Sequence, residues 1–151
     1  MRKVIISDTS TLIIFDKIGR LDLLQKVYGE LITTPEVAKE YGENLPNWIK
    51  VQSVIDKKYQ KFLETQVDGG EASAIALATE FENVTLILDD LKARKLAVNL
   101  HFKTTGALGV IIKAKQMSII PTIKPLIDKL LLTNFRISAN IINEILKLNN
   151  E

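Results

Sequence analysis

The chain has 151 residues, of which 46% are hydrophobic and 25% charged, and its formal net charge is +2. This length and composition predict one globular domain, residues 1–151, that is large enough to bury a core of its own. The absence of cysteine excludes disulfides, thiolate zinc sites and a cysteine nucleophile.

The first half of the chain alternates between strand-like and helix-like segments. An apolar run from Val4 ends at Asp8, and Thr9-Ser10-Thr11 then begins a helix. Pro35 suits the first position of a later helix, where its missing N–H is harmless, and Gly42 marks the end of that helix. After the first strand and helix, the predicted elements are a helix at 20–28, a strand at 31–33, a helix at 35–41, a strand at 48–54 and a helix at 55–66.

The second half continues the alternation. Asp68-Gly69-Gly70 interrupts the chain before a run of small residues from Glu71 to Ala78, which would let a helix lie close to a sheet. The later predicted elements are a strand ending at Asp89, a helix at 91–100, a strand near 102–104, a helix at 105–115 and two helices within 121–148, the second one capped by Ser138. Strands separated by helices predict right-handed crossovers and a parallel sheet covered on both faces.

The apolar stretches of the chain are short. The run after Lys3 has only a few apolar residues, too few for the core of a signal peptide. No stretch approaches the ~20 apolar residues that a membrane span needs. We therefore expect a cytoplasmic protein that does not associate with membranes.

Charge is distributed unevenly along the chain. Residues 64–90 carry seven acids and no Lys or Arg, whereas residues 91–136 carry nine bases and one acid. An acidic site beside basic surface suits an enzyme that binds a metal ion and acts on a polyanion. Many of these lysines would equally suit the solvated faces of helices.

Two apolar runs end on carboxylates, at Asp8 and at Asp89-Asp90. If both runs are parallel strands, their carboxyl ends lie at one edge of the sheet, where open α/β folds bind ligands. Like charges held close together raise one another's pKa, so a fold that gathers them usually holds a cation. The sequence therefore indicates metal-dependent chemistry on a phosphate.

Several motifs in order resemble the PIN domain, and they cover nearly the whole chain. The subgroup that the chain resembles has a Gly-Glu-Ala helix, an Asp-Asp pair followed by Arg and a Thr-Gly-x-Leu-Gly helix start. The matching segments are Asp8-Thr9-Ser10, Thr34 to Glu40, Gly70-Glu71 with its Ala-rich continuation, Leu88-Asp89-Asp90 with Arg94, and Thr105 to Gly109.

The resemblance implies a three-layer α/β/α sandwich with a parallel sheet of four or five strands, and a C-terminal helical extension, residues 121–151, packed on it. It also implies a metal-dependent endoribonuclease that uses Mg²⁺ or Mn²⁺ and is the toxin of a toxin–antitoxin pair. The expected partners are an RNA substrate, a second copy in a homodimer and a small antitoxin protein that covers the acids.

The resemblance assigns roles to individual residues. The catalytic acids would be Asp8, Glu40, Glu71 and Asp90, and the metal ligands Asp8, Glu71, Asp89 and Asp90. Two metal ions about 4 Å apart can activate a water and stabilise the leaving oxygen of a phosphodiester. The residues expected to bind substrate or orient groups in the site are Ser10, Lys92, Arg94, Lys103 and Thr105.

Each acid also has a purely structural interpretation. Asp8, Asp89 and Asp90 follow strands and suit N-caps, while a carboxylate in a first turn, such as Glu71, gains from the helix dipole. The alternative function is therefore a catalytically inactive PIN-like module that binds RNA or protein. Retention of all the acids favours the enzyme, because a module that only binds has little use for buried charge.

Three other folds with ligand sites at strand ends fit less well. A receiver domain would have its adjacent acids after the first strand, and a haloacid-dehalogenase-type phosphatase would have an Asp where Ser10 stands. The segment Thr105 to Gly109 lacks the glycine spacing of a dinucleotide-binding fold.

Overall fold

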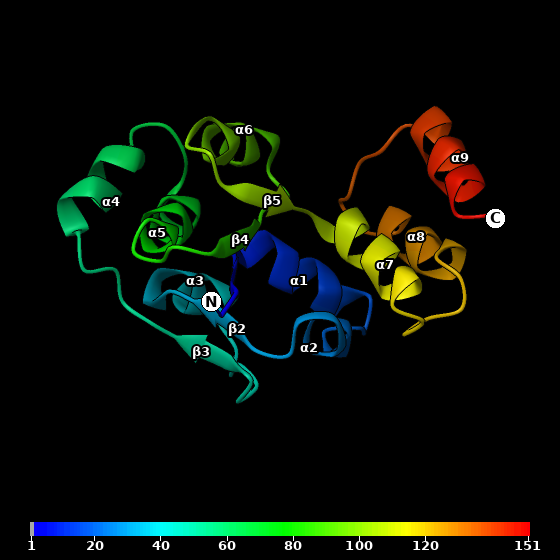
Figure 1. Ribbon diagram of the computed structural model, residues 1–151, viewed down its shortest axis with the longest axis horizontal. Coiled ribbons are helices and arrows are strands. Elements are labelled where there is room, and N and C mark those ends of the chain that lie inside the picture. The colour runs from blue at the N-terminus through cyan, green and yellow to red at the C-terminus, as the bar shows by residue number, and fades with distance from the viewer. Residues whose placement is uncertain (1) are drawn as a thin grey trace.

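The computed structural model describes residues 2–151, and within them the chain builds one five-stranded parallel sheet (Figure 1). The strand order is β3-β2-β1-β4-β5. The bounds are β1 Val4–Ser7, β2 Leu31–Thr33, β3 Ile49–Val51, β4 Val84–Ile87 and β5 Lys103–Thr105. The predicted parallel sheet is therefore confirmed, although β3 is shorter than the predicted strand at 48–54.

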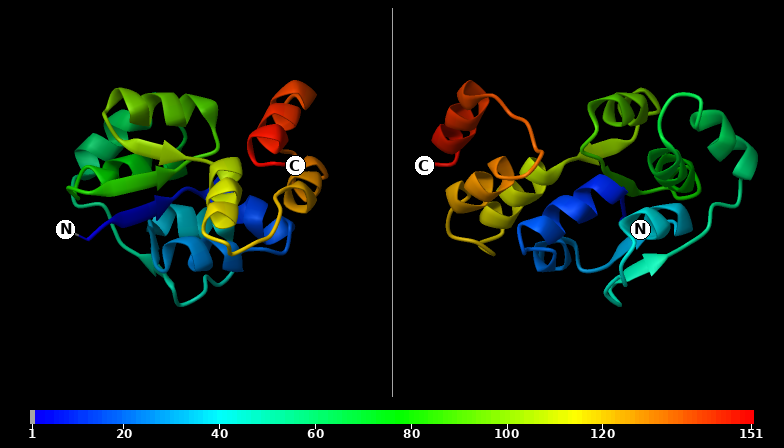
Figure 2. Two further views of the ribbon diagram at one scale, coloured as in Figure 1. Left: turned by 45° about the vertical axis from the view of Figure 1, so that its right-hand side comes forward. Right: turned by 180° about the vertical axis from the view of Figure 1, so that it is seen from behind.

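Helices cover both faces of this sheet, as the views from the front and from behind show (Figures 1 and 2). The first five are α1 Thr9–Lys17, α2 Asp22–Tyr28, α3 Pro35–Tyr41, α4 Lys57–Leu63 and α5 Gly69–Ala78. The later four are α6 Leu91–Asn99, α7 Ala107–Gln116, α8 Lys124–Leu131 and α9 Ala139–Leu148. The ends of each helix lie within a few residues of the predicted ends.

The core divides into two clusters, one on each face of the sheet. Ile5 of β1 packs in the cluster that includes residues of α1, α2, α7 and α8, whereas the next residue, Ile6, packs in the cluster of α4, α5 and α6. Leu86 and Ile87 of β4 alternate in the same way. This alternation follows from the two-residue period of a strand, and it confirms the three-layer α/β/α architecture.

Helix α5 is buried on all sides. Every residue from Gly70 to Ala78 is buried, and the helix contacts α3, α4 and β4. The hydroxyl groups of Thr34 and Ser73 hydrogen-bond across the α3–α5 contact at 2.6 Å. The Ala-rich sequence gives α5 a thin profile, and the predicted close approach of this helix to the sheet is confirmed.

The C-terminal helices differ in burial. Leu126, Ile127 and Leu130 of α8 are part of the core, whereas α9 has no buried residue. The Glu151 carboxylate accepts the backbone N–H of Ile123 at 2.8 Å, at the start of α8. Three apolar residues of α9 pack partly against the core, namely Ile142, Ile145 and Leu146. Ile141 and Leu148 of the same helix remain exposed. In residues 2–151 the helices are all too short or too polar to cross a bilayer.

Overpacking α5 is expected to destabilise the fold. Ala74 is fully buried, so Ala74→Leu should lower the free energy of unfolding by about 1–3 kcal/mol because the added carbons have no space. The same change at the exposed Ala139 of α9 should alter it by less than about 0.5 kcal/mol. Urea unfolding measures both, and equal values would contradict the tight packing of α5.

Candidate active site

The carboxyl ends of β1 and β4 lie side by side. Ser7 is paired with Ile87 in the parallel register, so the chain leaves both strands at the same level of the sheet. The backbone N–H of Asp8 then donates to the Ile87 carbonyl at 3.1 Å, and that of Asp89 donates to Asp8 Oδ2 at 3.4 Å. The two strand-end acids are therefore neighbours.

Asp8 is completely buried and caps α1, with its Oδ1 accepting the backbone N–H of Thr11 at 2.9 Å. Burial raises the pKa of Asp8 to about 7; the Thr11 hydrogen bond opposes this shift, and the charge of Asp89 adds to it. Within residues 2–151, Asp8 forms no ion pair with a Lys or Arg side chain. A nearby cation would therefore stabilise its charged form.

Asp89 joins three elements. Its Oδ2 accepts the hydroxyl of Thr11 at 2.8 Å, and its Oδ1 accepts the backbone N–H of Ala107, the first residue of α7, at 2.8 Å. The N-cap of α7 is Gly106, which has no side chain to do this. A Cβ on Gly106 would lie 2.9 Å from Asp89 Oδ1 and would overlap the guanidinium of Arg94. Asp89 thus serves the start of α7 rather than the start of α6.

A second group of acids lies at the starts of α5 and α6. Asp68 and Glu71 form a capping box on α5, and Asp90 caps α6 by accepting the backbone N–H of Ala93 at 2.9 Å. Burial raises the pKa of Glu71 to about 8, helped by the charges of Asp68 and Asp90. These three acids and Lys92 line a cavity of about 380 Å³.

Glu40 reaches the site from the last turn of α3. Its Oε1 accepts the hydroxyl of Thr9 at 2.8 Å, and a Cβ on Gly70 would overlap the same oxygen. The Glu40 carboxylate therefore lies between the first turns of α1 and α5. Only a glycine at position 70 leaves it that place.

The residues predicted to bind substrate differ in their surroundings. Ser10 lines a cavity together with Asp89 and Asp90, and Lys92 is exposed beside Asp90. The Arg94 guanidinium donates to the Leu88 carbonyl through Nε at 3.2 Å and through Nη2 at 2.8 Å. Arg94 therefore restrains the segment that carries Asp89 and Asp90.

The two predicted substrate-binding residues of β5 lie at opposite ends of that strand. Thr105 is half-buried, and its carbonyl accepts the backbone N–H of Leu88 at 2.8 Å. Lys103 begins β5 opposite Thr85, two residues before the end of β4. Burial, and then the charges of Lys113 and Lys103, lower the pKa of Lys3, which precedes β1. The structure therefore places Lys103 toward the amino ends of the strands, away from the acids it was predicted to accompany.

The acids form two separate groups, one at Asp8 and Asp89 and the other at Asp68, Glu71 and Asp90. Within residues 2–151, no three His, Asp or Glu side chains converge as a ready metal-binding group. Asp8 interacts with Asp89, and Glu71 interacts with both Asp68 and Asp90. All of these donors are carboxylate oxygens, and Mg²⁺ is usually held by one or two carboxylates together with waters and substrate phosphates. The residues present therefore fit a divalent cation of this kind.

Some residues that shape the site were not predicted from the sequence. Thr11 binds both Asp8 and Asp89, and Asp68 raises the pKa of Glu71. The Asp-x-x-Glu spacing of a capping box was a usable signal for Asp68. No local signal marks Phe135 and Arg136, which line the cavity beside Asp89 and Asp90.

Comparison with known protein families shows a relationship that covers nearly the whole chain. The family model DUF3368, described as a PIN domain, matches residues 4–151, which is nearly the whole chain. No curated protein and no solved structure matches.

The burial of Asp8 predicts a pH dependence of stability in the absence of metal. Its pKa is 3.8 in the unfolded chain and about 7 in the folded one, so the folded state binds the proton more tightly. Ionisation then opposes folding progressively as pH rises from about 4 to 7. Asp8→Asn keeps a capping oxygen and removes the ionisation. As pH rises across that range, the free energy of unfolding of the variant should therefore increase by roughly 2–4 kcal/mol relative to that of the wild type.

Urea unfolding in EDTA at several pH values measures this difference. Asp16→Asn, at an exposed position of α1, controls for the loss of a charge and should show no such gain. A difference between Asp8→Asn and the wild type that stays constant with pH would contradict the burial of an uncompensated carboxylate.

Proposed function

This chain belongs to the PIN-domain family, whose members are generally nucleases, and we propose that it is a Mg²⁺- or Mn²⁺-dependent endoribonuclease. The observation that carries the proposal is the burial of Asp8 beside Asp89 at the end of β1. Within residues 2–151, neither carboxylate forms an ion pair with a Lys or Arg side chain, so a divalent ion would stabilise the two charges. PIN nucleases generally use such metals.

The residues that would hold the ion are among Asp8, Asp89, Glu71 and Asp90. When bound, a divalent ion polarises a phosphodiester and lowers the pKa of a coordinated water. The rest of the site keeps the carboxylates in place. Thr11 and the Ala107 N–H fix the orientation of Asp89 through its two oxygens.

Glu40 has a different role in this proposal. Thr9 occupies one of its oxygens, and the side chain is otherwise exposed at the same edge. Its second oxygen is free to accept a proton from a water that approaches the substrate phosphate. Glu40 would then act as a general base. This role requires the carboxylate to keep the position that Gly70 leaves open.

We also propose that this chain acts as the toxin of a toxin–antitoxin pair. The chain would be a cytoplasmic toxin that forms a homodimer and binds a small antitoxin protein over its acids. The exposed Ile141 and Leu148 on α9 support a protein partner. Light scattering on the purified chain, alone and together with the product of any short neighbouring reading frame, tests both partners.

One observation favours the alternative of an inactive binding module. Within the described residues, no three acidic side chains converge closely enough to form a ready metal-binding group. Titration with millimolar Mg²⁺ or Mn²⁺ separates the two functions, because a bound ion stabilises the folded state by mass action. Neither stabilisation nor cleavage at these concentrations would favour the binding module.

Asp8→Asn is expected to abolish RNA cleavage in Mn²⁺ while leaving the protein folded. Loss of a ligand should lower the rate by at least about 100-fold, the upper end of what the loss of a ligand's supporting contact produces. A gel assay on single-stranded and structured RNA measures the rate, with Asp16→Asn as the control that retains activity. Full cleavage by Asp8→Asn would refute the assignment.

Gly70→Ala is expected to lower cleavage to the level of Glu40→Gln. The new Cβ would occupy the place of Glu40 Oε1 and lie 3.1 Å from the Thr9 hydroxyl, so the exposed Glu40 side chain must move away. Stability should stay within about 1 kcal/mol, because alanine is the better helix former. Kinetics and urea unfolding of the single and double variants measure this.

Gly69→Ala is the matched control, because a Cβ at that position meets no atom within 4 Å. It should leave cleavage unchanged, and the double variant Gly70→Ala/Glu40→Gln should be no slower than either single variant. Equal activities of Gly69→Ala and Gly70→Ala would show that the position of Glu40 is irrelevant to the reaction.

A further inference from the structure

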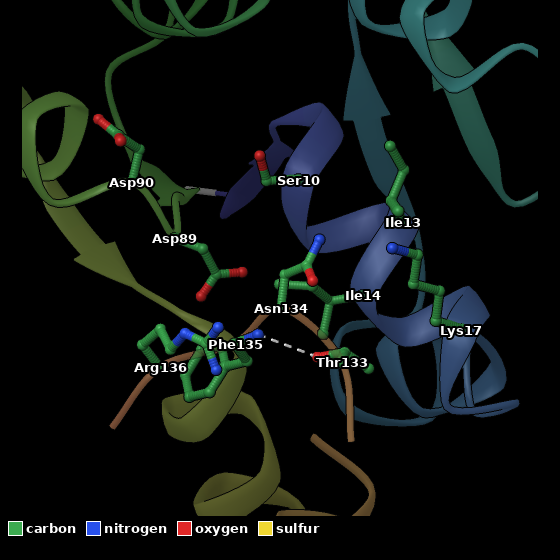
Figure 3. A pocket seen from close by; sticks show the side chains of 10 residues that line it. All are labelled: Ser10, Ile13, Ile14, Lys17, Asp89, Asp90, Thr133, Asn134, Phe135 and Arg136. Atoms are coloured by element: carbon green, nitrogen blue, oxygen red, sulfur yellow. Dashed lines mark hydrogen bonds between the residues drawn. The ribbon is translucent and has the colours of Figure 1, made fainter. Parts of the chain in front are cut away.

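A cavity of about 430 Å³ lies beside Asp89 and Asp90 (Figure 3). One wall is the outer side of α1, with Ser10, Ile14 and Lys17, and the other is the α8–α9 linker, residues 132–138, with Asn134 to Arg136. The volume falls in the range of about 300–1,000 Å³ that is usual for small-ligand sites. Segments more than 110 residues apart in the sequence thus enclose one space next to the acids.

The linker wall has a defined shape. The Thr133 hydroxyl donates to the Leu130 carbonyl at 2.6 Å and accepts the backbone N–H of Phe135 at 3.1 Å. The Phe135 ring is half-buried and packs against the core. Phe135 also lines the cavity, so an aromatic side chain is held in place there.

Two cations line the same cavity. Lys17 comes from the end of α1 and Arg136 from the linker, and both are exposed. Neither makes an ion pair with any carboxylate in residues 2–151. The cavity therefore combines an aromatic face, two available positive charges and the edge of the acidic site.

We propose that this cavity binds the nucleotide adjacent to the bond that is cut. The inference rests on the proposed nuclease function and adds the residues that hold its substrate. The base lies against Phe135 and Ile14, and the flanking phosphates lie near Lys17 and Arg136. Base–aromatic stacking and phosphate–cation contacts are the two interactions by which proteins usually bind single strands.

The position of Asp90 indicates the path that the bound strand follows across the protein. Asp90 lines this cavity and also the cavity that contains Glu71 and Lys92. A strand whose base sits at Phe135 can therefore continue past the acids toward Lys92. The bases of a duplex are paired and stacked inward, so the cavity accepts an unpaired nucleotide.

The test is binding without catalysis. A fluorescent single-stranded oligoribonucleotide is titrated in EDTA and followed by anisotropy, and its recovery uncut is checked on a gel. Lys17→Gln and Arg136→Gln should each weaken binding and reduce the slope of log K against log salt by about 0.7, the value for one phosphate contact on a single strand. Lys58→Gln, at an exposed position of α4, is the control with the same charge change and should do neither.

The aromatic contact is tested with abasic probes. Phe135→Leu keeps an apolar side chain against the core, and urea unfolding checks that it remains folded. Removing one base at a time from the oligonucleotide should weaken wild-type binding most at a single position, by at least about fivefold, which corresponds to the lower end of base stacking on an aromatic side chain. Phe135→Leu should no longer distinguish that position.

The outcomes separate this proposal from the nuclease proposal. Weaker binding by Lys17→Gln and Arg136→Gln supports the cavity even if the wild type cleaves no RNA in Mn²⁺. Wild-type cleavage together with unchanged affinities and salt slopes in both variants would overturn the cavity and leave the nuclease standing. Failure of the wild type to bind the oligonucleotide would also overturn it.

Discussion

The parallel pairing of β1 with β4 brings Asp8 and Asp89 together at the site. Because Ser7 is level with Ile87, both chains turn at the same edge of the sheet, and the backbone N–H of Asp89 reaches the carboxylate of Asp8. A shift of one residue in this register would turn the following side chains to the other face. The chemistry at this edge therefore depends on contacts that lie within the sheet.

The acids also begin the helices that surround them. Asp8 caps α1, Asp68 and Glu71 form the capping box of α5, Asp90 caps α6, and Asp89 binds the first N–H of α7. A carboxylate at a helix start gains from the backbone N–H groups and from the dipole. These contacts make a gathering of like charges tolerable, and a divalent cation would supply the remaining compensation for the buried charges of Asp8 and Glu71.

The sequence predicted most of what depends on local pattern. Strand ends, helix starts and the juxtaposition of Asp8 with Asp89 follow from periodicity, capping residues and the rule that parallel strands share an edge. The features that the sequence did not predict depend on how distant helices pack. Two examples are the space that Gly70 leaves for Glu40 and the cavity that Lys17 and Arg136 line. Lys103 is level with Thr85, two residues before the end of β4, and a count of charges along the chain does not show which end of a strand a residue occupies.

The central claim is that the edge formed by Asp8, Asp89, Glu71 and Asp90 binds a divalent cation. The most direct measurement is the anomalous diffraction of manganese in crystals soaked with Mn²⁺. We expect an anomalous peak within coordinating distance of the Asp8 or Asp90 carboxylate, and its absence from crystals of Asp8→Asn. No peak at this edge under saturating Mn²⁺, or a peak that survives unchanged in the variant, would contradict the claim.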